Sequence, residues 1–142
     1  MRTVRDEDGT RYVLLKESGE SSLVRDPETG ERRHLANADL EPVEGESPLV
    51  TAARAVPAPL RQLLTAIPDE RALGLLLELD ARDGVAVRTL LAETDFCESD
   101  LHGFLVELQA AGLIGETRVA GERGYRTTET AATALARLRD GE

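Results

Sequence analysis

The spacing of hydrophobic and polar residues changes about a third of the way along the 142-residue chain. Over residues 1–45, short apolar runs alternate with turn signals such as Asp8-Gly9, Ser18-Gly19 and the segment 26–30, which contains both Pro and Gly. This pattern predicts four or five short antiparallel strands. The strands form a small meander, and two alternatives stay open: an open sheet or an SH3-like barrel.

Residues 46–67 combine a polar stretch with two short helical segments, and we expect them to connect two modules. The first helix is predicted over residues 49–56 and ends before Pro57. The second covers residues 60–67. Pro59 opens it, at a position where a first helical turn tolerates proline.

From residue 68 to residue 142 the apolar residues recur mainly at helical spacing. Asp69 is an N-cap candidate for the first helix of this module, and Thr128 for the last. The predicted order is a helix from residue 70, a short strand at 85–86, helices at 87–93 and 98–111, strands at 113–119 and 125–127 around a tip at 120–124, and a helix at 129–138. This is the order of a winged helix-turn-helix. We therefore predict an α+β fold with a β-meander at 1–45, connecting helices at 46–67 and a winged helix-turn-helix domain at 68–142.

Two segments of this second half are similar to known regulators. The stretch CESDLHGFLVELQAAGLI (97–114) resembles the recognition helix and following strand of MarR-, ArsR- and PadR-like transcriptional regulators, and YRTTETAATAL (125–135) resembles their step from wing to last helix. The resemblance covers residues 69–139. It implies binding of double-stranded DNA, usually by a homodimer, with the third helix of this domain in the major groove and the wing on the DNA backbone.

Carried onto this sequence, the resemblance implies a set of DNA-contacting residues. Ser99 and His102 can hydrogen-bond base edges, and Gly103 allows close approach of the backbone. The arginines can pair with phosphate oxygens. The full set of candidates is Arg88, Glu98, Ser99, His102, Gly103, Arg118, Arg123 and Arg126.

The charge distribution departs from the pattern of these regulators. The segment 69–114 carries ten acidic and three basic residues, and its third helix has no Lys or Arg, whereas residues 115–139 carry five basic and three acidic residues. Phosphate contacts must therefore come mainly from the wing and the last helix. Glu98 or Asp100 would accept a hydrogen bond from cytosine or hold a cation against phosphate. The alternative is a winged helix that no longer contacts DNA and binds a protein partner, through its acidic third helix or through the N-terminal β-module.

The overall composition resembles that of proteins from extreme halophiles. Acidic residues outnumber basic ones by 27 to 17, Lys16 is the only lysine, and aromatic residues make up 3% of the chain. In about 1 M salt the Debye length is roughly 3 Å, so an acidic balance argues less strongly against DNA than it does in dilute buffer. The N-terminal residues show no secretory signal and no apolar run is long enough to cross a membrane, which favours a cytoplasmic protein.

Catalytic chemistry finds no support in the sequence. It contains no nucleophile elbow, phosphate-binding glycine loop or paired carboxylates, so we expect no enzymatic activity and no cofactor. One cysteine and two histidines also argue against a metal site. Cys97 is interpreted as a half-buried small residue in the helix-turn-helix turn, with a redox-sensing thiol at a helix N-terminus as the alternative.

Overall fold

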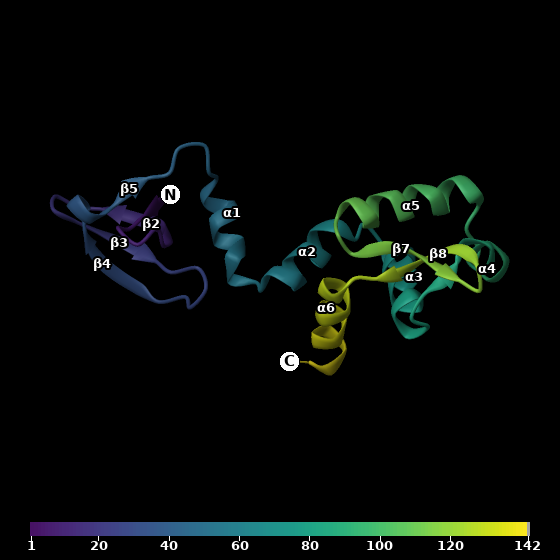
Figure 1. Ribbon diagram of the computed structural model, residues 1–142. Helices are drawn as coiled ribbons and strands as arrows, with labels where there is room; N and C mark the ends of the chain where they lie inside the picture. Colours follow the sequence, from purple (N-terminus) through teal and green to yellow (C-terminus); the bar gives the residue numbers. More distant parts are fainter. Residues whose placement is uncertain (142) are drawn as a thin grey trace. The chain divides into compact units, whose positions relative to one another are not determined.

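The computed structural model describes residues 1–141, which form two compact units, residues 1–58 and 59–141. The first unit contains an antiparallel sheet of five strands in the order β4-β3-β2-β1-β5 (Figure 1). The strands are β1 (Arg2–Arg5), β2 (Arg11–Glu17), β3 (Ser21–Arg25), β4 (Arg32–Ala36) and β5 (Glu41–Pro42).

The sheet is open, so the SH3-like barrel is not formed. The strands β4 and β5 are its two edges and do not pair with each other within the described residues. Strand β5 has only two residues and ends in Pro42, which has no backbone N–H to donate. A sheet with so short a last strand has too few backbone hydrogen bonds available to close on itself.

Both faces of this sheet are covered near its centre. One face carries a small apolar cluster built from Val4, Tyr12, Leu14 and Val24. On the other face α1 (Pro48–Ala52) contacts β1 and β2, and the hydroxyls of Thr51 and Thr3 share a buried hydrogen bond of 2.7 Å.

The segment 46–67, expected to connect the modules, is divided between the two units. The helix α1 and the 3-10 turn η2 (Ala53–Ala55) lie in the first unit. The helix α2 (Ala58–Ala66) starts at the boundary and inserts Leu63, which is 2% exposed, into the core of the second unit. A side-chain hydrogen bond from Gln62 to the carbonyl of Ala111 fastens α2 further.

The second unit is a winged helix-turn-helix. Its further elements are α3 (Glu70–Ala81), β6 (Val85–Ala86), α4 (Val87–Glu93), α5 (Glu98–Ala110), β7 (Ile114–Val119), β8 (Glu122–Thr127) and α6 (Glu129–Asp140). The predicted caps are confirmed: Asp69 accepts from the backbone N–H of Ala72 at 2.9 Å, and Thr128 accepts from that of Ala131 at 3.3 Å. Gly112 has the predicted left-handed conformation after α5, with a φ of 76°.

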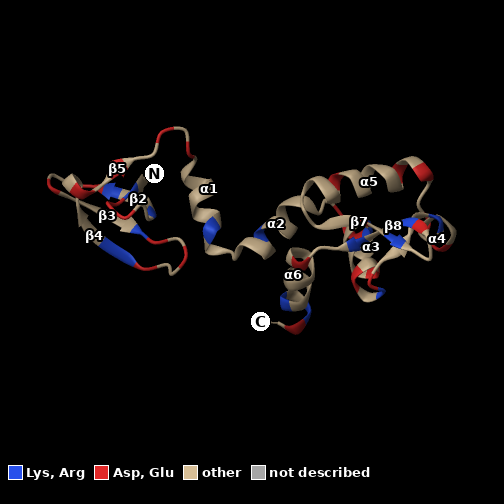
Figure 2. Cartoon of the chain, in the orientation of Figure 1, with Lys and Arg blue, Asp and Glu red and all other residues tan. Residues whose placement is uncertain are grey.

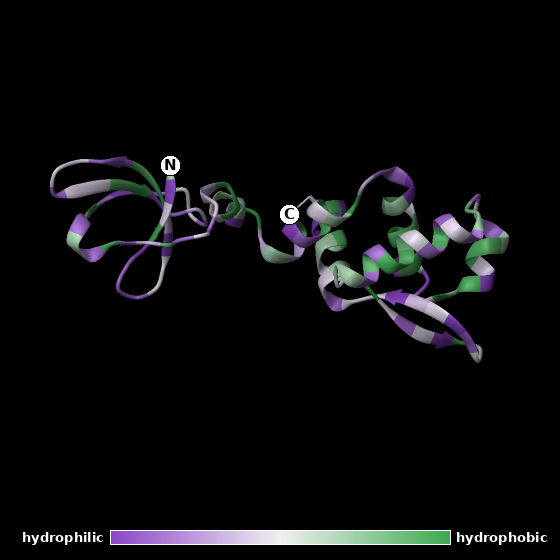
Figure 3. Ribbon diagram, turned by 90° about the horizontal axis from the view of Figure 1, so that it is seen from above, coloured by the Kyte–Doolittle hydropathy of each residue, from purple (hydrophilic) through white to green (hydrophobic). Residues whose placement is uncertain are grey.

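The core of this unit lies among the helices and one face of a three-stranded sheet of order β6-β8-β7. As predicted, α5 directs Leu101, Leu105 and Leu108 inward, each at most 3% exposed. The wing, formed by β7 and β8, is seen in Figure 3 as a predominantly hydrophilic ribbon. No helix among residues 1–141 is long and apolar enough to cross a membrane.

The wing is longer than the sequence predicts. Its turn consists of Ala120 and Gly121 alone, both with positive φ, and β8 starts at Glu122. Gly124 is therefore not part of the tip but a buried strand residue facing β6. A Cβ atom on Gly124 would lie 2.6 Å from the carbonyl oxygen of Val85, so the close approach of the paired strand β6 explains this glycine.

Candidate nucleic-acid interface

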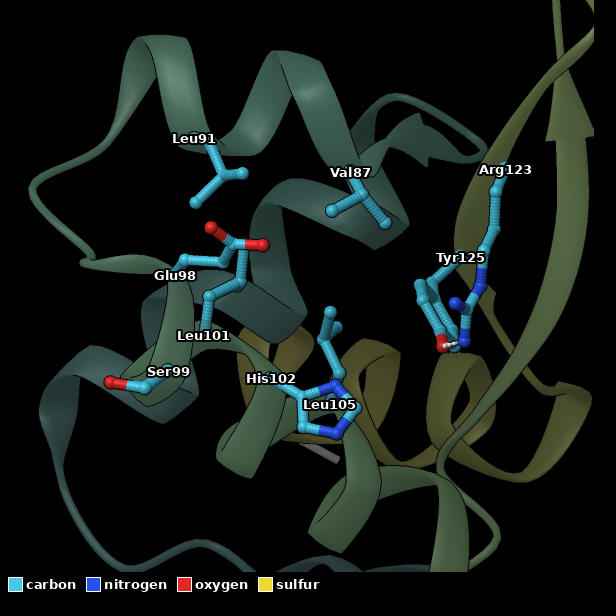
Figure 4. A pocket seen from close by; sticks show the side chains of 9 residues that line it. All are labelled: Val87, Leu91, Glu98, Ser99, Leu101, His102, Leu105, Arg123 and Tyr125. Atoms are coloured by element: carbon cyan, nitrogen blue, oxygen red, sulfur yellow. Dashed lines mark hydrogen bonds between the residues drawn. The ribbon is translucent and has the colours of Figure 1, made fainter.

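A groove separates the N-terminal half of α5 from the wing, with a volume of about 610 Å³. Its apolar floor is formed by side chains of α4 and α5 that also pack on the core, among them Val87 and Leu105. Its polar lining comes from Glu98, Ser99 and His102 on α5 and from Arg123 and Tyr125 on β8 (Figure 4). The fold thus brings four of the eight candidate residues, Glu98, Ser99, His102 and Arg123, to one depression.

Within this groove His102 and Arg123 face the same space from opposite sides, whereas the hydroxyl of Ser99 points away from Arg123 (Figure 4). Ser99 also lines a second depression, on the other side of α5, together with Asp100, Gly103 and Glu107. Ser99 therefore lies on the exposed surface of α5 between the two depressions, and Gly103 lies on the side of α5 away from the wing.

Arg123 is held in place by three contacts on its own ribbon. Its guanidinium donates to Glu116 at 2.8 Å and to the hydroxyl of Tyr125 at 2.8 Å, and it lies over the Tyr125 ring at 5.7 Å from the centroid. The hydrogen bond to Tyr125 and the negative charge of Glu116 raise the pKa of Arg123 further above its already high value. The sequence pattern predicts Arg123 at the tip, but it lies within β8, because the turn has only two residues.

The other wing arginines lie on different faces of the ribbon. Arg118 is directly opposite Arg123 in the strand register and shares its face, and its guanidinium donates to the carbonyl of Gly121 at 3.3 Å. Arg126 is exposed and lies on the opposite face, since side chains alternate along a strand. Arg118 and Arg123 can therefore reach the same anionic ligand, such as one phosphate strand, from one face of the ribbon. Arg126 cannot join them from that face.

Arg88, at the start of α4, reaches the wing rather than α5. Its guanidinium lies 3.3 Å from the carboxylate of Glu122, and its side chain is 85% exposed. Two of the candidate arginines, Arg88 and Arg123, are thus paired with acidic residues of the wing. Charge colouring shows acidic but no basic residues along α5 (Figure 2).

Three residues that shape this surface were not predicted from the sequence. Glu116 and Glu122 neutralise the wing arginines, and the two-residue turn, had it been recognised, would have placed Glu116 opposite Tyr125. Arg71 of α3 lines the depression beside Asp100 and Gly103 and lies 4.3 Å from the centroid of the Phe96 ring. Only the packing of α3 against α5 brings Arg71 there.

Cys97 is the N-cap residue of α5, and it is exposed rather than half-buried. Its thiol lies 3.5 Å from the hydroxyl of Ser99. The interpretation as a partly buried packing residue is wrong, because the turn residues before α5 bury Phe96 instead. Among residues 1–141, no group of three His, Cys, Asp or Glu side chains is arranged to hold a metal ion.

The chain belongs to a family of unknown function, DUF7346, whose model matches residues 1–139. Among solved structures, an ArsR-like transcriptional regulator from Rhodococcus sp. RHA1 is similar at 28% sequence identity and a TM-score of 0.45, over 59% of this chain and 80% of that chain. No curated protein matches the sequence. The assignment of the winged helix-turn-helix fold rests on the element order and packing described above.

Proposed function

We propose that this member of the family binds double-stranded DNA and regulates transcription, with α5 in the major groove and the wing on the phosphate backbone. The observation that carries the proposal is the groove in which α5 and β8 present polar side chains toward one space, His102 from the helix and Arg123 from the ribbon. An α-helix fits the major groove of B-form DNA, and a ribbon beside it reaches the adjacent backbone.

The candidate residues divide into two roles. Ser99 on the exposed surface of α5 and His102 beside it are suited to hydrogen bonds with base edges, and Gly103 allows close approach of the helix backbone. Arg118 and Arg123, on one face of the wing, are suited to phosphate oxygens. Arg88, beside Glu122 of the wing, extends this contact, and Arg126 would reach phosphate from the opposite face of the ribbon. A homodimer would present two such surfaces to the two halves of a palindromic site.

Carboxylates moderate this interaction. A phosphate that binds Arg123 or Arg88 must compete with Glu116 or Glu122, which occupy their guanidinium groups in the free protein. Glu98 and Asp100 on α5 would either accept from the amino group of cytosine or hold a cation against the DNA. Affinity then depends more on base contacts by α5 than in regulators with a basic recognition helix.

The test is selection of bound fragments from genomic DNA by the full chain across a series of KCl concentrations up to several molar. We expect an enriched sequence. Arg118→Ala and Arg123→Ala weaken binding about equally for all sequences, and His102→Ala and Ser99→Ala change the preferred sequence. The control is Arg2→Ala, which removes one charge from the other unit. Absence of any enriched sequence at every salt concentration would contradict the proposal.

A second candidate function is a protein-interaction module. The motivating observation is that α5 exposes Glu98, Asp100 and Glu107 without a basic residue, while Arg88 and Arg123 are already paired with carboxylates. The surface potential of the assembled dimer separates the two functions. A continuous basic strip through both wings favours DNA, and an acidic surface across both α5 helices favours a protein partner.

A further inference from the structure

The sheet of the N-terminal unit carries its basic residues unevenly. In the register of β2, β3 and β4, Val13 lies opposite Arg25 and Arg25 opposite Arg32; in the next row, Lys16 lies opposite Leu23 and Leu23 opposite His34. Directly opposed residues point to the same side of a sheet. Arg25, Arg32, Lys16 and His34 therefore surround Leu23 on one face, which we call the basic face.

No acidic residue occupies these register positions. In the part of the chain that the structure describes, the side chains of Arg25, Arg32 and Lys16 have no ion pair. The contrast with Arg33, which alternates with them on β4, is clear. Arg33 lies on the other face and donates to the buried hydroxyl of Tyr12 at 2.7 Å. Arg33 thus has a hydrogen-bond partner within the sheet, whereas Arg25 and Arg32 have no ion pair among the described residues.

Two like charges directly opposite one another destabilise a sheet. The pair of Arg25 and Arg32 is the more notable in a chain with a net charge of −10, where acidic residues are abundant. Strand β4 is also an edge strand, and Arg32 and His34 on it are exposed. The helix α1 lies on this same face of the sheet, but its contacts are with β1 and β2, where Val13 is buried, rather than with the basic residues of β4. An external anion that approached the two guanidinium groups would relieve this repulsion.

We propose that the basic face of β3 and β4 binds the phosphate backbone of double-stranded DNA, as a second contact in addition to that of the winged helix. This inference rests on the proposed function. A DNA duplex fits better than an acidic protein segment because the winged-helix unit on the same chain would hold the duplex at high effective concentration. A row of phosphates also matches a pair of guanidinium groups, with no demand on sequence. The contact supplies positive charge that α5 lacks.

The test compares duplex binding by the full chain and by its Arg25→Gln/Arg32→Gln variant across a KCl series. We expect the double variant to bind about tenfold more weakly at the lowest salt, with the slope of log affinity against log salt reduced by about 1–2, the loss of one or two phosphate contacts. The loss is the same for selected and unrelated sequences. Arg2→Gln is the matched control, because Arg2 is an exposed arginine on the opposite face of the same sheet, and it retains wild-type binding.

Unfolding provides a second measurement. Removing the opposed charges leaves the thermal unfolding midpoint unchanged or higher, so weaker binding cannot be attributed to a damaged fold. If the wild type binds duplex and the double variant binds it equally well, the basic face has no role in DNA binding and the proposed function stands. Binding of poly-glutamate is measured in the same way. If the double variant loses binding to poly-glutamate but keeps binding to duplex, the basic face is assigned to acidic proteins instead. If the wild type binds no duplex, both proposals fail.

Discussion

The guanidinium of Arg123 lies 2.8 Å from the carboxylate of Glu116, its diagonal neighbour on the opposite strand of the wing. Both side chains are more than half exposed, so the pair is in contact with solvent. The wing therefore contains an internal competitor for the phosphate that Arg123 is proposed to bind.

Replacing this competitor should strengthen DNA binding. We expect Glu116→Gln to raise duplex affinity about two- to fivefold, a modest gain because exposed ion pairs are weak. The measurement is a binding titration at fixed KCl. Glu129→Gln removes the same charge at the start of α6, where Glu129 has no ion pair among residues 1–141, and should change affinity less. Equal affinities for Glu116→Gln and wild type would show that Arg123 does not contact the duplex.

The two glycines Gly103 and Gly124 should respond in opposite ways to substitution by alanine. Gly124→Ala places a Cβ 2.6 Å from the carbonyl oxygen of Val85 and should destabilise the second unit by about 1–3 kcal/mol. A Cβ atom on Gly103 would meet no atom of another element within 4 Å, so Gly103→Ala should stabilise α5 by about 0.5–1 kcal/mol. Denaturant unfolding measures both.

Gly103→Ala also tests the DNA-facing side of α5. If the backbone at Gly103 approaches the major groove closely, the added methyl group weakens specific binding while it raises stability. A variant that is more stable and binds with unchanged affinity would exclude close approach at this residue.

Adjacent leucines of α2 should differ sharply, because this helix belongs to the core of the second unit. Leu63 is 2% exposed and Leu64 is 60% exposed. We expect Leu63→Ala to cost about 2–5 kcal/mol of unfolding free energy and Leu64→Ala to cost less than about 0.5 kcal/mol. Similar losses for both variants in urea unfolding would mean that α2 does not pack as described.

The attachment of α1 to the N-terminal sheet should depend on pH through Glu46. Its carboxylate accepts from Arg11 at 2.8 Å and from the hydroxyl of Thr51 at 3.1 Å. The hydrogen bond from Arg11 is the main cause that lowers the pKa of Glu46. A lowered pKa in the folded state means that the stabilisation is complete above the ordinary glutamate pKa of about 4.3, and is lost as the pH falls through the lower folded value.

The corresponding measurement is the thermal midpoint of wild type and Glu46→Gln from pH 7 down to pH 3. We expect the variant to be less stable at pH 7 and the difference to shrink below about pH 4. Glu44→Gln serves as the control, since Glu44 is exposed and has no ion pair within residues 1–141. A difference that stays constant over the whole range would contradict the role of the Glu46 charge.

Local patterns in the sequence were sufficient for most elements. The N-caps at Asp69 and Thr128, the left-handed Gly112 and the inward leucines of α5 follow from hydrogen bonding and side-chain spacing within a few residues. For that reason the winged helix-turn-helix could be predicted from the sequence. The prediction of the wing was wrong at its tip, where Gly124 was interpreted as a turn residue. Its actual constraint is the close approach of the Val85 carbonyl on the paired strand β6, and Val85 lies 39 positions away in the chain.

The sequence by itself determined the order of helices and strands and the acidic character of α5, and it supplied the candidate residues for the proposed DNA contact. Only the tertiary structure decided the surroundings of the charged residues: Arg123 lies beside Glu116, Arg88 beside Glu122, and Arg25 opposite Arg32, with no acidic partner for these last two among residues 1–141. Helix and turn formation depend on neighbours in sequence, which a pattern records. The environment of a charged side chain depends on strand register and packing between distant segments, which the pattern does not contain.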